Sequence, residues 1–186
     1  KSSAASDVYK RQESGWTDTD GDGYVDKDGQ KLSINWLTYP TRLEQPKLAE
    51  YAQATLKDIG IDVQVNNTSD HRTFAENGEF DVYVSSTTTA PTGDPEYFFT
   101  STVVGSKNYG NYQNEEVTKL TEQLHQTFDK DERGKLATEL QQDILDDDAF
   151  FFVSHLNMGI VTKSNVTGMA AHPCDYYEIT ADLDVE

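Results

Sequence analysis

Apolar and polar residues alternate with two different periods along this chain, and these periods predict strands and helices in turn. Three runs with a period of two predict strands at 32–37, 61–65 and 80–84. Between the first two runs, residues 44–59 carry apolar positions at helical spacing and end at Gly60, which predicts a helix. A β-α-β succession favours parallel pairing, so the predicted fold class is α/β, with a mixed sheet flanked by helices.

The second half of the chain predicts a pair of antiparallel amphipathic helices. Asn114 is suited to cap the first helix, and Asp129 with Glu132 forms a capping-box-like start for the second. The apolar face of the first helix is expected to include Val117, Leu120, Leu124 and Phe128. Beyond the helices, the apolar runs 150–153 and 160–162 predict two further strands, of which the first is expected to be buried.

A hydroxyl-rich loop, residues 85–92, separates the third predicted strand from a short helix expected at 95–99. Ligands of open α/β sheets bind at the carboxyl ends of the strands, so this loop is the predicted binding segment, and a solvated Ser/Thr loop is the alternative. The Gly/Asn/Tyr stretch 105–112 is a second candidate rim, although its tyrosines are equally suited to packing. The predicted ligand-binding residues are Thr88, Thr89, Thr92, Tyr109 and Asn111.

Charge and composition exclude several functions. The net charge of −18 leaves no basic stripe for phosphates, so no nucleic acid is expected as a partner. No apolar run reaches the roughly 18–20 residues that a membrane span requires. No Gly-x-Ser-x-Gly, His-Glu-x-x-His or phosphate-loop motif occurs, and the four histidines are scattered. The sequence therefore predicts a protein that is not an enzyme.

Residues 15–29 have the spacing of an EF-hand-type calcium loop, with Gly23 at its turn position. The candidate metal ligands, at positions 1, 3, 5, 7 and 9 of such a loop, are Asp18, Asp20, Asp22, the Tyr24 carbonyl and Asp26. Position 12, which is normally a bidentate glutamate, is Gly29, and no flanking helices are evident. The segment is therefore expected to be either a weak structural calcium site or an acidic hairpin with Asp-Gly turns.

The first residues differ in character from the rest. Asp7 to Gln12 reads as one translated frame of a common transposase sequencing-adapter end. Residues 1–12 are therefore expected to be a non-native leader that takes no part in the fold.

Three stretches, in their order and spacing, resemble the extracytoplasmic solute-binding proteins of peptide and nickel ABC importers. They are Gly15 to Gly23, Leu48 to Val65, and Phe80 through Gly93-Asp94-Pro95 to Tyr112. The resemblance implies a periplasmic-binding-protein-like carboxyl-terminal lobe at 13–172 and a tail at 173–186 that crosses toward a second lobe. It also implies an extracytoplasmic location, ABC permease subunits as partners, and a monomer that captures a small-molecule or metal-chelate ligand.

The resemblance also bears on the cargo. Peptide-binding members place an aspartate two residues before the Gly-Asp-Pro, and the matching position here is Pro91. The Ala90-Pro91 pair instead resembles nickel- and metallophore-binding members, so the expected cargo is a chelated transition metal, nickel, with no other cofactor required. The open alternatives are an oligopeptide or dipeptide, a sugar or opine, and, from another class, a calcium-stabilised surface interaction module.

Overall fold

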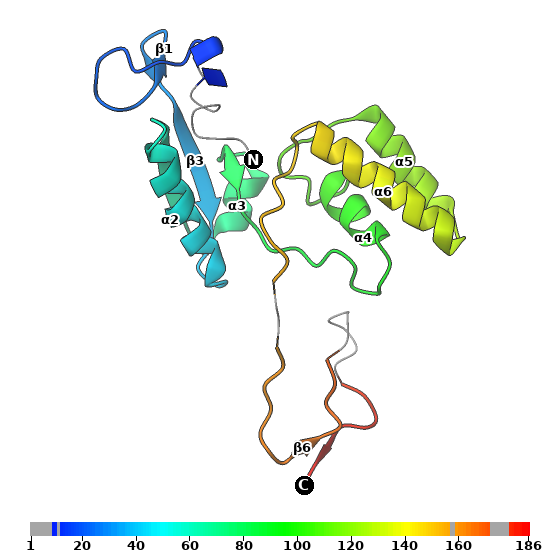
Figure 1. Ribbon diagram of the computed structural model, residues 1–186. Coiled ribbons are helices and arrows are strands. Elements are labelled where there is room, and N and C mark those ends of the chain that lie inside the picture. Colours follow the sequence, from blue (N-terminus) through cyan, green and yellow to red (C-terminus); the bar gives the residue numbers. More distant parts are fainter. Residues whose placement is uncertain (1–8, 11, 157–158, 172–178) are drawn as a thin grey trace. The chain divides into compact units, whose positions relative to one another are not determined.

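The computed structural model describes residues 9–10, 12–156, 159–171 and 179–186 (Figure 1). The chain divides into two compact units, Lys1–Ser86 and Thr87–Glu186, and the boundary falls within the hydroxyl-rich loop. Most of the expected leader (1–8 and 11) and the first part of the expected tail (173–178) lie outside the described residues.

The first unit contains a three-stranded parallel sheet in the order β4-β3-β5. Its strands are β3 (Ser33–Thr38), β4 (Asp62–Asn67) and β5 (Val82–Tyr83). Ile34 lies opposite Val63 and Trp36 lies opposite Val82, so the predicted parallel pairing is confirmed. The antiparallel pairing of this unit is separate, in a small ribbon of β1 (Asp26–Lys27) and β2 (Gln30–Lys31).

Helices α2 (Glu44–Lys57) and α3 (His71–Glu76) lie on opposite sides of β3 (Figure 1). The chain runs from β3 through α2 to β4, and then back through α3 past β3 to β5. The two right-handed crossovers run in opposite directions along the sheet, so their helices lie on opposite faces. Helix α2 ends at Lys57, two residues before the predicted end at 59, and the turn after it includes Gly60, whose φ of 78° is one that glycine adopts without strain. The core of this unit is formed by buried Leu37, Tyr39, Ala49, Ile61, Val63 and Ala75.

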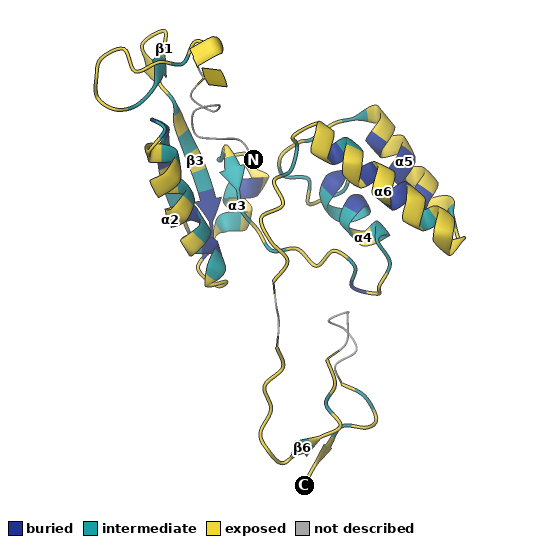
Figure 2. Ribbon diagram, in the orientation of Figure 1, coloured by how far each residue is buried: buried dark blue, intermediate teal, exposed yellow. Residues whose placement is uncertain are grey.

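The second unit is built on the predicted helical pair, α5 (Glu115–Gln126) and α6 (Lys130–Asp146). Helix α4 (Glu96–Phe98) continues into a π-helical turn at Phe99–Val103 that packs against this pair. Figure 2 shows the buried residues gathered on the facing sides of these helices. Both predicted caps are present, at Asn114 and Asp129. Within the described residues, no helix is long and apolar enough to cross a membrane.

The two strands expected after α6, at 150–153 and 160–162, are absent. The first run is also not buried, contrary to the prediction. Residues 150–156 and 159–165, all described, contain no strand, and the side chains of Phe151 and Val161 are 90% and 95% exposed. A strand requires a partner for its backbone hydrogen bonds, and the described part of the chain pairs none with these runs. Within the first run, Phe150 packs against the helical core, and the ring of Phe152 lies 5.9 Å from that of Phe98. The last pairing is β6 (Val166–Thr167) with β7 (Asp184–Val185), antiparallel.

Phe128 was predicted to lie on the apolar face of α5, and this was wrong. The helix ends at Gln126, and Phe128 is 91% exposed in the turn before α6. The capping residue Asp129 starts the next helix directly afterwards, so the backbone leaves the helical path before Phe128 could reach the core.

Candidate functional site

The start of the hydroxyl-rich loop is held by the carboxyl end of the parallel sheet. The backbone N–H of Ser86 donates to Tyr39 Oη at 3.1 Å, and its hydroxyl accepts from Gln45 Nε2 at 2.7 Å. Tyr39 directly follows β3, and Gln45 lies in the first turn of α2. The place where the loop begins is therefore set by residues that the β-α-β unit brings together.

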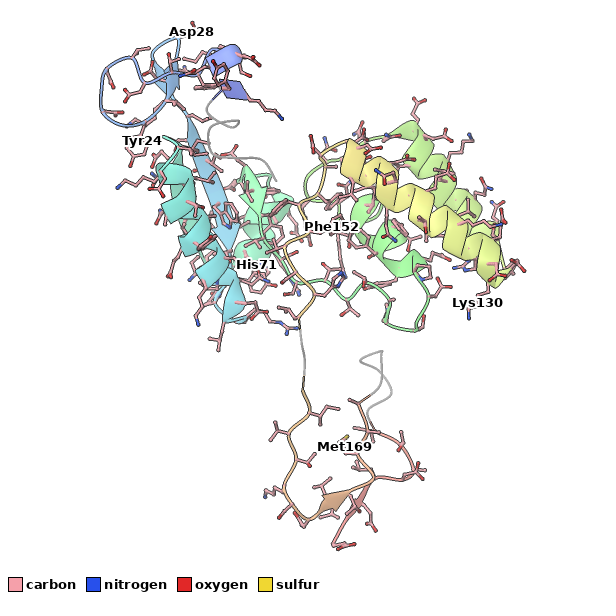
Figure 3. All side chains as sticks on the ribbon, viewed as in Figure 1. Tyr24, Asp28, His71, Lys130, Phe152 and Met169 are labelled. Atoms are coloured by element: carbon pink, nitrogen blue, oxygen red, sulfur yellow. The ribbon has the colours of Figure 1, made fainter. Side chains whose placement is uncertain are left out.

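His71 extends this polar group at the same end of the sheet. Its ring stacks on Tyr39 with centroids 4.1 Å apart, and its Nδ1 lies 2.6 Å from Tyr83 Oη. Burial lowers the pKa of His71, which favours the neutral form of its ring. Figure 3 labels His71 within the first unit. Sequence reasoning missed this cluster, because the periodicity of α3 does not reveal what its first residue stacks on.

The middle of the loop faces solvent. Thr88, Thr89 and Thr92 are exposed, whereas Pro91 is buried. A turn closed by the Gly93 N–H donating to the Ala90 carbonyl at 2.9 Å follows Thr89 and contains Thr92. Exposed hydroxyl groups are what both a ligand-binding loop and a solvated loop require.

The two predicted residues of the second rim differ in exposure. Tyr109 is half-buried, and Asn111 is exposed with a φ of 51°. The Asn111 side chain accepts from Gln113 Nε2 at 3.2 Å, so part of its hydrogen-bonding capacity is used within the stretch itself.

An open cavity of about 650 Å³ lies in the second unit, at the end of the loop. Its lining is formed by Thr92, Asp94, Glu96, Tyr97, Thr100, His125, Phe128 and Arg133. Thr92 is thus the one predicted ligand-binding residue in this lining; the other four, all described, lie outside it. Sequence reasoning did not foresee that Thr92 would share a cavity with charged side chains from α5 and α6.

The charged side of that cavity is an ion-pair network around Arg133. Its Nη2 lies 2.6 Å from Asp94 Oδ1 and 2.8 Å from Glu96 Oε2. The hydrogen bonds from Arg133 hold the pKa of both carboxyl groups below their ordinary values. His125 Nδ1 lies 2.6 Å from Glu96 Oε1, and this contact raises the pKa of the histidine. Asp94 also accepts from the Glu96 N–H at 2.9 Å.

The acidic loop of the first unit brings together part of the predicted calcium set. One carboxylate oxygen from each of Asp18, Asp20 and Asp22 lies within 4.8 Å of the others, and all three residues are exposed. Asp22 forms an ion pair with Lys31. Asp26 is engaged elsewhere, since it accepts from the backbone and hydroxyl of Thr19 at 2.9 and 2.7 Å.

The turns of this loop have the Asp-Gly geometry that both interpretations require. Gly21 and Gly23 have φ values of 81° and 89°, and their N–H groups donate to Asp18. Tyr24, whose carbonyl is the fourth candidate ligand, places its ring 4.2 Å from Lys31 Nζ (Figure 3). Three of the five candidate positions are therefore clustered, and a lysine already neutralises one carboxylate of the cluster.

Comparison with known proteins identifies relatives for most of this chain. A family model described as bacterial extracellular solute-binding proteins, family 5 Middle, matches residues 12–110. The oligopeptide-binding protein AppA of Bacillus subtilis is 30% identical over 173 residues, which are 90% of this chain and 32% of the relative. The nickel-binding protein NikA of Staphylococcus aureus is 26% identical over 168 residues, 89% of this chain and 34% of the relative. The chain thus spans about a third of the length of these relatives.

Solved structures agree with the sequence comparison. The structure of a nickel ABC transporter protein from Bacillus halodurans superimposes with a TM-score of 0.68 and 28% identity, over 80% of this chain and 31% of the other. AppA in complex with a nonapeptide gives a TM-score of 0.63 over 76% and 29% of the two chains, and NikA of S. aureus with Ni(L-His)2 gives 0.64 over the same shares. These similarities confirm the predicted α/β fold of the periplasmic-binding-protein type.

Proposed function

We infer that this chain, which belongs to the bacterial extracellular solute-binding proteins of family 5, contributes one side of a solute-binding site that serves an ABC importer. Members of this family are binding proteins and not enzymes, as the sequence predicts. The partners that we propose are ABC permease subunits, and we propose that the protein is monomeric and works outside the cytoplasmic membrane. The binding residues proposed on this side are Thr88, Thr89, Thr92, Tyr109 and Asn111.

The proposed cargo is a transition metal, nickel, held by a small organic chelator. The supporting observation is that the loop offers hydroxyl groups and no available carboxylate. Residues 85–93 contain no acidic side chain, and Asp94, the next residue, is engaged by Arg133. The α-ammonium group of a bound peptide would have no carboxylate partner in this loop, and a buried charge without a partner is costly. Hydroxyl groups, in contrast, suit the polar periphery of a chelate.

A peptide is the alternative cargo, because the relatives include both kinds of binder. AppA is named for oligopeptides and NikA for nickel, and their identities to this chain are similar. A peptide would then need an acidic anchor outside the hydroxyl-rich loop.

Calorimetry on the protein expressed from its complete reading frame separates the two cargoes. The expected result is saturable binding of Ni(L-His)2 and no heat with a nonapeptide. Thr92→Val should weaken the binding of Ni(L-His)2 by about threefold to tenfold through the loss of one hydrogen bond. The matched control Thr138→Val, an exposed threonine on α6, should leave it unchanged. Tight peptide binding without any response to Ni(L-His)2 would overturn the proposal.

We also propose that Asp18, Asp20 and Asp22 take up a structural calcium ion of low affinity. The clustering of their carboxylate oxygens supports this, and calcium takes several such ligands at once.

Calcium should then raise the melting temperature relative to a sample with chelator. Asp18→Asn should remove the increase, whereas Asp28→Asn, outside the cluster, should retain it. A large loss of stability on chelation, of tens of degrees, would instead favour the calcium-stabilised interaction module. An equal response to magnesium would argue against a calcium site.

A further inference from the structure

Arg133, in the first turn of α6, uses all of its N–H donors. Nε donates to Asp94 Oδ2 at 2.9 Å, and Nη2 donates to Asp94 Oδ1 at 2.6 Å and to Glu96 Oε2 at 2.8 Å. Nη1 donates to the carbonyl groups of Leu124 and Thr127, each at 2.6 Å. A guanidinium group has five N–H donors in a planar fork, so its capacity is fully used. The side chain is only 13% exposed.

The acceptors come from three separate segments of the second unit. Asp94 lies two residues after the hydroxyl-rich loop and Glu96 begins α4, while the two carbonyl groups belong to the last turn of α5 and the residue after it. Carbonyl groups at a helix carboxyl end have no partner within the helix. The Leu124 carbonyl also accepts from the Thr127 N–H at 3.2 Å, and Arg133 adds a second donor to it. Arg133 therefore connects the end of the loop to the carboxyl end of α5.

Little chain separates this connection from the exposed threonines. Thr92 lies two residues before Asp94, and the Ala90–Gly93 turn and the buried Pro91 lie between Asp94 and Thr89. The direction in which the loop enters α4 consequently sets where the hydroxyl groups of Thr89 and Thr92 point.

We propose that Arg133 is a positioning residue that holds the hydroxyl-rich loop in one geometry for its cargo. The inference rests on the proposed function, in which Thr89 and Thr92 contact that cargo. Arg133 itself acts through Asp94 and Glu96, by fixing the end of the loop to α5.

The shape of the guanidinium group matters here as well as its charge. A lysine ammonium keeps the charge, but it is a compact group with three donors and cannot span two carboxylates and two carbonyl groups at once. Without the fork, Glu96 keeps its contact with His125 and Asp94 keeps the Glu96 N–H. The helices therefore retain their packing, while the connection between the loop and α5 is lost.

Amide hydrogen exchange on the full chain tests this inference without any ligand. In Arg133→Lys and Arg133→Gln, the hydrogen-bonded amides of Gly93 and Glu96 should exchange about tenfold to a hundredfold faster, because charge-assisted hydrogen bonds that restrain local opening are lost. The amides of Leu120 and Leu140 in the helical core should change by less than about threefold. Arg42→Lys, at an exposed arginine of the first unit, should leave all four amides unchanged.

Two results would overturn the inference. If the Gly93 and Glu96 amides of Arg133→Lys exchanged as in the wild type, a positive charge alone would be sufficient to hold the loop. If the amides of the helical core and of the loop accelerated equally, Arg133 would stabilise the whole fold and not the loop in particular. Should Arg133→Gln fail to fold, Asp94→Asn replaces it, since it keeps the size of the side chain and removes the charge facing the fork. It is expected to accelerate the Gly93 and Glu96 amides selectively.

Binding gives a second readout on the protein from its complete reading frame. Arg133→Lys should weaken binding of Ni(L-His)2 about tenfold, while the backbone amides of the helical core exchange as in the wild type. Unchanged affinity together with a loosened loop would contradict the positioning role. If the wild type bound neither Ni(L-His)2 nor a nonapeptide, the proposed function would fail, while exchange would still decide whether Arg133 fixes the loop.

Discussion

At the scale of single residues, the polar geometry of this protein depends on partners that are far apart in the sequence. Asp147 directly follows α6, in a run of three aspartates. In the structure its Oδ2 accepts from Tyr112 Oη at 2.6 Å and from Asn114 Nδ2 at 2.7 Å, across 35 and 33 residues. Arg133 likewise reaches Asp94 across 39 residues. No local pattern encodes such pairs, so these residues could not be predicted, whereas the exposure of the threonine run could.

The Tyr112–Asp147 contact predicts a pH effect. Burial, and secondly the hydrogen bond to Asp147, raise the pKa of Tyr112 from 10.0 to about 12. The folded state thus binds this proton more tightly than the unfolded state does. The related stability is fully present below pH 10.0 and is lost as the pH rises through about 12.

Phenolate absorbance measures this effect. An alkaline titration of the folded chain should contain a late step that Tyr112→Phe removes. Tyr51→Phe, at a tyrosine that is 71% exposed, should leave the late step in place. If the late step remained in Tyr112→Phe, the assignment would be wrong.

At the scale of elements, what could be predicted was what depends on neighbouring residues. Helices α5 and α6 were predicted together with their caps, because Asn114 and Asp129 bond to N–H groups two and three residues ahead. The runs 150–153 and 160–162 have strand composition but no strand structure, since pairing depends on a partner that the run itself does not contain. Local chemistry was therefore a reliable guide to helices and a poor one to these strands.

The cap of α5 predicts a measurable loss on mutation. Asn114 Oδ1 accepts from the N–H groups of Glu116 and Val117 at 2.9 and 3.1 Å. Asn114→Ala should lower the free energy of unfolding by about 1–2 kcal/mol, because two donors at the helix start lose their acceptor. Gln123→Ala, at an exposed position of the same helix, should stay within about 0.5 kcal/mol of the wild type in urea denaturation. Equal effects of the two substitutions would argue against the capping role.

Two glycines predict effects of opposite sign. Gly60 has a φ of 78°, and a Cβ there would lie 3.2 Å from Val25 Cγ1 and 3.3 Å from the Gly23 carbonyl oxygen. Gly60→Ala should therefore lower the free energy of unfolding by about 1–3 kcal/mol. Gly134, within α6, has open space around its added Cβ, so Gly134→Ala should raise the free energy by about 0.5–1 kcal/mol. Denaturant midpoints that moved in the same direction would contradict this account.

At the scale of the whole molecule, the dominant feature is negative charge. The chain carries 33 acidic and 15 basic residues, and the ion pairs of the described residues include surface pairs that contribute little. Acidic side chains are dense on the exposed faces of α5 and α6, where Glu115, Glu116, Asp131 and Glu132 fill the first turns. At the helix starts these negative charges interact favourably with the helix dipole, but over the whole surface they repel one another.

This repulsion predicts that salt stabilises the protein. The screening length falls from about 30 Å at 0.01 M to about 3 Å at 1 M ionic strength, so distant like charges cease to interact. The melting temperature should therefore rise across this range of sodium chloride, with chelator present to exclude calcium binding. Glu139→Lys, at an exposed acidic position of α6, should flatten the rise, whereas Gln142→Asn, at an exposed neutral position, should not. A melting temperature that fell with added salt would mean that attractive pairs such as Arg133 with Asp94 outweigh the net repulsion.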